Sequence, residues 1–189
     1  MTIAIFVFLG LLGLIFISTA ITAYNGLIAL RTQVDRAWAN IDVILKQRFD
    51  EIPQLVEVLE QFVQHEKSVI RTVMEARAHY GSAKNPADKA KAAGEMSMAL
   101  QGIFAIGEAY PELKSNANFV QIQGRLSALE GQLADRRETY NESVTNWNTR
   151  IAQFPDMFFA SMMSAQPREM YRVAEHEKAR PSLKMNLGS

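Results

Sequence analysis

Few side chains in this sequence have the types and spacing that catalysis or metal binding requires. His65 and Glu66 match the start of an HExxH zinc-protease motif, but Val69 occupies the place of the second histidine ligand. The chain has no glycine-rich phosphate loop, no GxSxG elbow and no carboxylate pair set apart from its solvated charges. Cysteine is absent, which excludes disulfides, thiol nucleophiles, thiolate metal sites and lipid attachment at an N-terminal Cys. We therefore expect no enzymatic activity, no catalytic or metal-binding residues and no cofactor.

The charged residues are balanced. Lysine plus arginine and aspartate plus glutamate each number 20, so the formal net charge is zero. Without a basic surface, nucleic acid is not an expected partner. Asp42 and Arg48 lie close to an apolar stripe, and pairing them with Arg137 and Glu130 across a helix bundle would fix helix register. A structural role is the default for these charges.

The N-terminal segment is long, apolar and uncharged. From Thr2 to Leu30 there is no charged residue or histidine, and residues 3–24 are almost wholly apolar. A membrane-spanning helix needs about 20 such residues. A secretory signal peptide is the alternative, because Ser18 to Ala20 resembles a cleavage site, but no Lys or Arg precedes the run, which is longer than a signal peptide needs. The sequence thus predicts an uncleaved transmembrane anchor over residues 1–24, with the lipid bilayer as partner of residues 3–24.

The orientation of this anchor follows from nearby positive charge. Arg31 and Arg36 lie on its C-terminal side, whereas its N-terminal side offers only the α-amino group. The positive-inside rule then places the rest of the chain in the cytoplasm.

The rest of the chain has helical periodicity. Apolar residues step by threes and fours from Leu27 to Ile52, and a second helix is expected from Pro53 to Tyr80. A third helix is expected near 87–109, and a fourth from Phe119 to Phe154, with spacing typical of coiled coils and four-helix bundles. We predict an all-α, up-and-down four-helix bundle over residues 25–167, whose first helix continues from the transmembrane helix. Residues 168–189 are predicted to form a flexible C-terminal tail.

Two surfaces are candidates for binding. In an up-and-down bundle the fourth helix returns to the membrane, where the segment after it contains a cluster of large apolar side chains: Met157, Phe158, Phe159, Met162 and Met163. This cluster and Tyr24 are predicted to lie in the membrane interface or to contact a partner; a lid over the open end of the bundle is the alternative. The Tyr-Asn pairs at residues 24–25 and 140–141 are predicted to share one membrane-proximal level.

The second surface is a pair of glycines on the fourth helix. Gly124 and Gly131 lie seven residues apart, just outside the apolar stripe. They would allow another helix to approach closely, which predicts self-association; tolerated surface glycines are the alternative.

Several runs of the sequence resemble the LemA family of bacterial membrane-anchored helical proteins. They are YNGLIALR at 24–31, AWANIDVILKQRFDEIPQLVE at 37–57, YPELKSNANF at 110–119, YNESV at 140–144 and WNTRIAQFP at 147–155. The resemblance implies a membrane helix, a four-helix bundle and a bacterial cell-envelope location. It supplies no reaction and no catalytic residues. Genes of this family often neighbour those of membrane proteases, which suggests envelope quality control by association only.

The function expected from these observations is binding. The leading hypothesis is a non-enzymatic, LemA-like interaction or scaffold protein of the bacterial inner membrane, assembled as a homo-oligomer. The alternative is an adaptor or regulator of a membrane protease, which would then be its partner.

Overall fold

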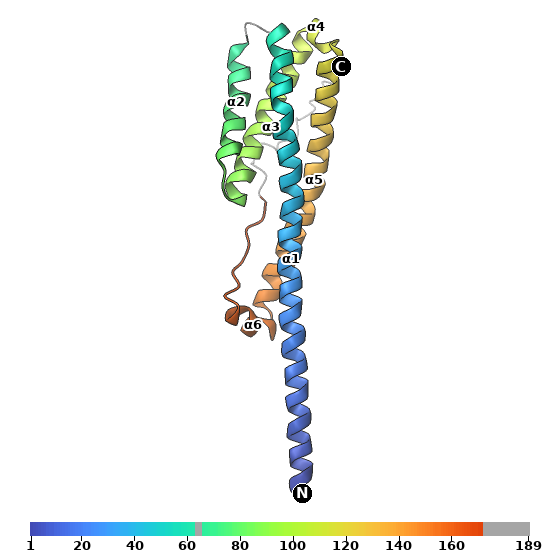
Figure 1. The fold of residues 1–189 in the computed structure, drawn as a ribbon, viewed down its shortest axis with the longest axis vertical. Helices are drawn as coiled ribbons and strands as arrows, with labels where there is room; N and C mark the ends of the chain where they lie inside the picture. Colours follow the sequence, from blue (N-terminus) through green and yellow to red (C-terminus); the bar gives the residue numbers. More distant parts are fainter. Residues whose placement is uncertain (63–65, 172–189) are drawn as a thin grey trace, which may run out of the picture. The chain divides into compact units, whose positions relative to one another are not determined.

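The computed structural model describes residues 1–62 and 66–171. Within these residues every regular element is a helix, which confirms the predicted all-α class (Figure 1). In chain order the helices are α1 (Thr2–Phe62), α2 (Lys67–Ser82), α3 (Pro86–Ala109), α4 (Pro111–Lys114), α5 (Ala117–Ala152) and α6 (Asp156–Met162). The chain divides into two compact units, unit 1 with residues 1–41 and 135–170, and unit 2 with described residues 42–62, 66–134 and 171.

Helix α1 does not end at Pro53, where the sequence predicted the start of a second helix. Pro53 lies inside α1, which continues to Phe62. An interior proline loses one backbone hydrogen bond and costs about 3 kcal/mol. Ile52 and Leu55, on either side of it, are both fully buried, so their packing outweighs this cost. Asp50, whose side chain would suit the cap of a helix that starts at Pro53, is therefore an interior residue of α1.

The core of unit 2 comes from one face of each of its helices. Its largest fully buried apolar side chains are those of Ile52, Leu55, Val73, Ile103, Leu113, Phe119, Leu126 and Leu133. Helix α3 begins where the sequence predicted, because the Asn85 side chain accepts a hydrogen bond from the Asp88 amide and Pro86 occupies the first turn. A Cβ on Gly107 would lie 2.7 Å from the Phe119 ring, so glycine at this position lets α3 and the ring pack closely.

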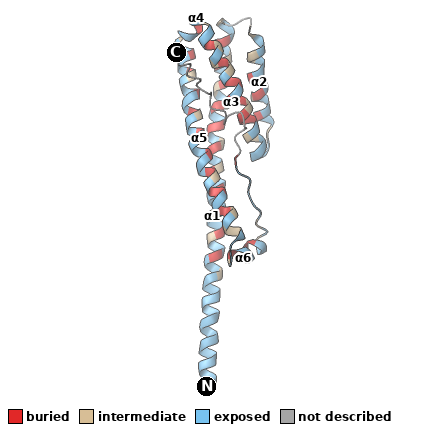
Figure 2. Ribbon diagram, turned by 180° about the vertical axis from the view of Figure 1, so that it is seen from behind, coloured by how far each residue is buried: buried red, intermediate tan, exposed pale blue. Residues whose placement is uncertain are grey.

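The core of unit 1 is built between α1 and α5. Leu27, Val34 and Ile41 of α1 are buried, as are Val144 and Trp147 of α5 (Figure 2). In the predicted up-and-down bundle α5 runs antiparallel to α1, and two contacts fit this direction. Trp38 packs edge-on against Tyr140 with ring centroids 5.5 Å apart, and a Cβ on Gly26 would lie 3.8 Å from Nη2 of Arg150.

The buried arginine of α5 in unit 1 is Arg137, which is 8 % exposed, whereas its neighbour Arg136 is exposed. A stripe that steps from Leu133 by four and then by three reaches residues 137 and 140.

The residues expected to form a tail begin at 168, and residues 168–171 make the contacts described below. Residues 172–189 lie outside the described part of the chain.

Candidate functional site

Helix α6 is amphipathic. Asp156 and Ala160 are buried and Phe159 and Met163 are half-buried, all at helical spacing on one face. The opposite face is apolar and exposed, with Met157, Phe158 and Met162 at 45, 58 and 83 % exposure. The helix thus covers unit 1 with one side and leaves an apolar surface on the other. One face of α6 is thus buried, as expected of a lid, and contact of the other face with a membrane or a partner stays a prediction.

Phe154 belongs to this exposed surface and not to the core stripe of α5, to which the sequence spacing assigned it. Helix α5 ends at Ala152, so the helical periodicity no longer applies at residue 154. The side chain is 78 % exposed and meets Phe158 edge-on, with ring centroids 5.9 Å apart. We call Phe154, Met157, Phe158 and Met162 the apolar face.

An ion pair joins the end of α5 to the start of α6. Nε of Arg150, in the last turn of α5, lies 2.5 Å from Oδ2 of the buried Asp156, in the first turn of α6. Each charge suits the dipole of its helix end. Because Arg150 also lies beside Gly26, α6 starts at the level where the apolar N-terminal stretch ends. Tyr24, one half turn earlier, is 49 % exposed.

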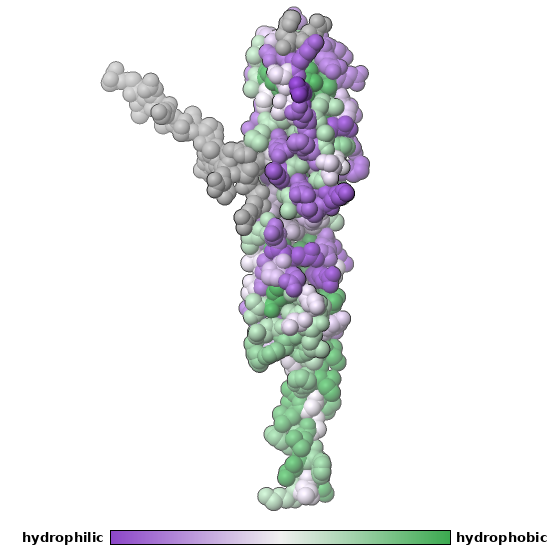
Figure 3. All heavy atoms as spheres, turned by 90° about the vertical axis from the view of Figure 1, so that its left-hand side faces the viewer, coloured by the Kyte–Doolittle hydropathy of each residue, from purple (hydrophilic) through white to green (hydrophobic). Residues whose placement is uncertain are grey.

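The hydrophobic surface of unit 1 is continuous over this level. Figure 1 shows α6 beside α1, directly beyond the apolar N-terminal stretch. In Figure 3 the green surface of that stretch continues onto the broader part of the unit at the level of α6. Helix α1 is long and apolar enough to cross a membrane, and its most apolar 18-residue stretch has no buried residue.

The two Tyr-Asn pairs do not share one level, contrary to the sequence-based prediction. Tyr140 packs against Trp38, which is 14 residues from Tyr24 in the continuous helix α1 and hence about 20 Å along its axis. The prediction of a shared level took the first helix of the bundle to end near Pro53. Because α1 is longer, its antiparallel partner α5 is displaced along it.

Polar groups of α5 hold the segment that follows α6. Trp147 Nε1 donates to the carbonyl of Gln166 (2.9 Å), and the Tyr140 hydroxyl donates to the carbonyl of Glu169 (3.0 Å). The Asn148 side chain makes two hydrogen bonds with the backbone of Arg168, at 2.8 and 2.9 Å. Tyr140 and Trp147 have the 3,4 spacing of the buried stripe of α5, and this spacing does not reveal the function of their polar atoms. A buried Tyr or Trp usually finds such a partner, but the sequence does not say which.

The end of α6 shapes the same segment. Ala165 N donates to Ala160 O and Ser164 N donates to Ser161 O, the two bonds of a Schellman motif. Ser164 adopts the left-handed conformation that this motif requires, with φ of 51°.

The Tyr140 hydroxyl lies in a buried and charged environment. Burial raises the pKa of Tyr140 above its ordinary value. Arg168 lowers this pKa, whereas Asp35 and Glu169 raise it further.

The segment 163–168 borders an open hollow of about 420 Å³, whose other lining residues are Arg31 and Trp147. The Arg168 guanidinium lies 3.3 Å from Asp35, which is one helical turn after Arg31. Arg31 is exposed and has no hydrogen bond or ion pair among the described residues. The hollow is therefore lined by two guanidinium groups, and one of them, that of Arg168, is paired with a carboxylate outside the lining.

Unit 2 contains the predicted glycine pair. A Cβ on Gly124 or on Gly131 would meet nothing within 4 Å, so neither glycine is required by packing inside the chain. Gly131 lines an open hollow of about 460 Å³ together with two other small residues of α5, Ser127 and Ala134. Its remaining lining comes from Arg48, Ser97, Leu100, Gln101, Phe104, Leu126 and Glu130.

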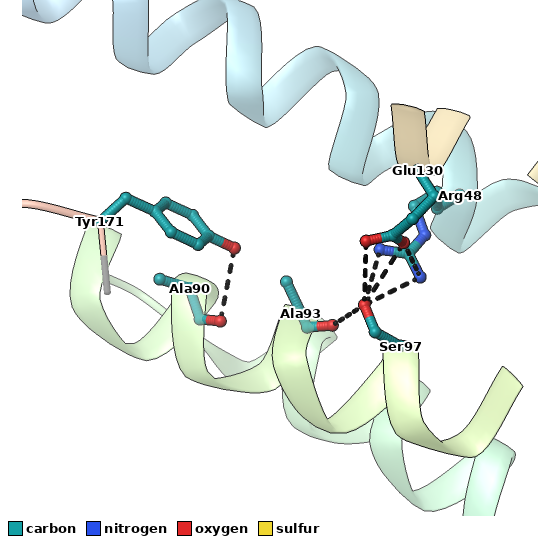
Figure 4. Close-up of polar contacts among 6 residues, drawn as sticks. All are labelled: Arg48, Ala90, Ala93, Ser97, Glu130 and Tyr171. Atoms are coloured by element: carbon teal, nitrogen blue, oxygen red, sulfur yellow. Dashed lines mark hydrogen bonds and ion pairs between the residues drawn. The ribbon is translucent and has the colours of Figure 1, made fainter. Parts of the chain in front are cut away.

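Arg48 is at the edge of this hollow and is only 1 % exposed. Its Nη2 lies 2.9 Å from Glu130 Oε2, and both terminal nitrogens lie 3.3 Å from the Ser97 hydroxyl oxygen (Figure 4). The predicted pairing of Arg48 with Glu130 is thus confirmed. Asp42 instead accepts hydrogen bonds from Lys89 at 2.5 Å and from the Tyr80 hydroxyl at 3.4 Å. Burial and the Asp42 carboxylate raise the pKa of Tyr80 above its ordinary value.

His79 is the histidine that lies among the described residues. His79 bonds with Glu95 across 2.8 Å on the surface, and His65 and His176 lie outside the described residues. Among the residues that the structure describes, no three His, Asp or Glu side chains converge as ligands for a metal ion.

The fold and these surfaces define an all-helical protein with an apolar N-terminal helix next to an exposed apolar face. The model of the LemA family matches residues 37–185, so the chain belongs to the LemA family. A search of curated proteins gave no match.

Proposed function

We propose that this chain is a single-pass, membrane-anchored binding protein of the bacterial inner membrane, without catalytic activity of its own. Residues 3–24 cross the bilayer, and the four long helices form an up-and-down bundle on the cytoplasmic side. Membership of the LemA family, the length of the exposed apolar stretch and the position of Arg31 and Arg36 after it support this proposal. The antiparallel contacts of α1 with α5 support the bundle topology.

The observation that supports membrane contact best is the apolar face of α6. Four large apolar side chains are exposed where the apolar part of α1 ends, and water is an unfavourable environment for such a surface. In the interface of the bilayer the same side chains are buried among lipid, as in other interfacial amphipathic helices. Helix α6 then acts as a second membrane contact that limits how far α1 can slide or tilt.

The absence of cysteine allows this proposal to be tested with single labels. A fluorescent probe on Met162→Cys, in the full chain in lipid vesicles, should be quenched by lipids that have a quencher near the headgroup. A probe on Thr139→Cys, which lies 13 residues before Ala152 on α5 and is also exposed, should not be quenched. Equal quenching at both positions would contradict the interfacial location of α6.

The bundle binds a second copy of the same chain through the surface around Gly124 and Gly131. Two glycines that packing inside the chain does not require, next to a hollow lined by small residues, let the backbone of another helix approach α5. A closed homo-oligomer built in this way is a scaffold held at the membrane.

Mass measurement of the detergent-extracted full chain tests the scaffold. A uniform oligomer supports self-association. A monomer that co-purifies with a membrane protease supports the alternative function as an adaptor or regulator of that protease. A monomer with no partner would leave both without support.

A further inference from the structure

We propose that the hollow between Arg31 and segment 163–168 of unit 1 binds the phosphate of an anionic phospholipid. This inference rests on the membrane anchoring proposed above and goes beyond it, because it assigns a specific lipid contact to named residues. The site is formed by α1, the end of α5 and the loop after α6, all within one unit.

Charge is the first argument for a phosphate. Arg31 and Arg168 line the hollow with two positive charges, and Asp35, which pairs with Arg168 from outside the lining, offsets one of them, so about one positive charge remains for a ligand. A phosphodiester with one negative charge complements it, and guanidinium groups bind phosphate oxygens in a bidentate manner. Arg31 has no partner among the described residues, so binding a phosphate breaks no ion pair of its own.

Rigidity is the second argument. The loop that presents Arg168 is held by Trp147 and Asn148 through hydrogen bonds to its backbone at Gln166 and Arg168. The Schellman turn fixes Ser164, whose exposed hydroxyl is a further donor at the hollow. A site that is formed before the ligand arrives loses little side-chain and loop entropy on binding.

Depth is the third argument. Arg31 follows Tyr24 by seven residues in α1, about 10 Å along the helix axis. The polar region on each side of the hydrocarbon core is about 5 to 8 Å thick. In a helix, side chains lean toward the N-terminus, so the long Arg31 side chain reaches back toward the bilayer and ends at the level of the lipid phosphates.

The experiment uses the full chain in nanodiscs of phosphatidylglycerol and phosphatidylethanolamine. Native mass spectrometry after release into detergent measures the fraction of protein that retains phosphatidylglycerol. Arg31→Gln should lower this fraction about five-fold, the effect of one cation near a charged membrane surface. Arg31→Lys should restore most of it, because the positive charge returns.

Arg36→Gln is the matched control, because it removes the same charge from an exposed position of the same helix outside the hollow. Retention should stay at the level of the unchanged protein. An equal loss in both variants would indicate attraction by charge alone and would overturn the site, as would full retention in Arg31→Gln with an unaltered circular dichroism melting curve.

Two further outcomes separate the ligand sources and the underlying proposal. Excess glycerol 1-phosphate, which has the phosphate without acyl chains, should not displace the lipid; displacement would assign the hollow to a soluble phosphate ester and overturn the lipid. Flotation with vesicles tests the anchor: failure of the unchanged protein to float overturns the anchoring and this inference together. Flotation with equal lipid retention in all variants overturns the inference alone.

Discussion

Each unit has an open hollow lined by arginine. The two hollows differ in which groups neutralise the positive charge of the arginine side chains. In unit 2, Arg48 is buried and already bound by Glu130 and Ser97. In unit 1, Arg31 is exposed and has no ion pair among the described residues, while Arg168 pairs with Asp35. Arg48 therefore contributes to the fold, whereas Arg31 remains available for a ligand.

Burial explains the difference. A guanidinium removed from water must be paired inside the protein, because leaving it unpaired costs several kcal/mol. An exposed guanidinium is solvated and can exchange water for an external anion at little cost. The two hollows are about 460 and 420 Å³, so size does not distinguish them. Substitutions that remove one charge should therefore affect folding in unit 2 and binding in unit 1.

The largest effect is expected for Glu130→Gln. It leaves the Arg48 guanidinium buried without its carboxylate and should lower the free energy of unfolding by about 2 to 3 kcal/mol. Arg48→Met should cost about 1 kcal/mol, because an apolar side chain fills the site and Glu130, whose side chain is 41 % exposed, can be solvated. Urea unfolding followed by circular dichroism measures both. Equal losses would contradict this assignment.

The next effect is a gain in stability. Replacing both Gly124 and Gly131 with Ala should raise the free energy of unfolding by up to about 1 kcal/mol each, since nothing obstructs the new methyl groups. The same variant should shift the mass of the extracted protein toward the monomer. Gly107→Ala is the control, because its methyl group would meet the Phe119 ring and should destabilise unit 2. An oligomer unchanged by the double substitution would disprove contact through this surface.

A smaller effect separates the two faces of α6. Phe159→Ser removes a half-buried ring and should lower the free energy of unfolding by about 1.5 kcal/mol. Phe158→Ser, at 58 % exposure, should change it by less than about 0.5 kcal/mol but weaken the quenching of a Met162→Cys probe by headgroup-level lipids. If Phe158→Ser were the more destabilising change, α6 would function as a lid only.

The smallest effect near neutral pH is expected at one tyrosine in each unit, because these tyrosines change the free energy of unfolding only at high pH. The pKa values of Tyr80 and Tyr140 are raised in the folded protein, whereas an unfolded chain loses the phenolic proton near pH 10. The folded state therefore binds more protons above pH 10, so stability is fully present below pH 10 and falls as pH rises, by up to about 1.4 kcal/mol per pH unit for each tyrosine.

Tyr80→Phe should remove more of this pH dependence than Tyr140→Phe. Asp42 raises the pKa of Tyr80 beyond the effect of burial, whereas Arg168 partly offsets burial at Tyr140. Thermal melts at a series of pH values above 9 provide the measurement. An unchanged pH dependence in both variants would contradict the buried state of these hydroxyl groups.

Much of the fold could be predicted because it depends on local pattern. The bounds predicted for α3 and α5 agree with the structure within two residues, since caps and apolar spacing are properties of neighbouring residues. The pairing of Arg48 with Glu130 could be predicted from two charges close to apolar stripes. The helix boundary predicted at Pro53 was wrong. Proline usually starts or breaks a helix, but here the packing of Ile52 and Leu55 outweighs the cost of an interior proline.

The sequence by itself determined the all-helical class and the apolar N-terminal stretch, because both follow from the types of residues and their spacing. Only the tertiary structure decided which side of α6 is exposed, at which level of α1 it begins and which backbone groups Trp147 and Asn148 hold. These features depend on the register of α1 against α5, and that register is set by contacts between residues more than 100 positions apart in the sequence, such as Trp38 with Tyr140. The hollow beside Arg31 exists only in that register, because its walls come from three separate segments of the chain.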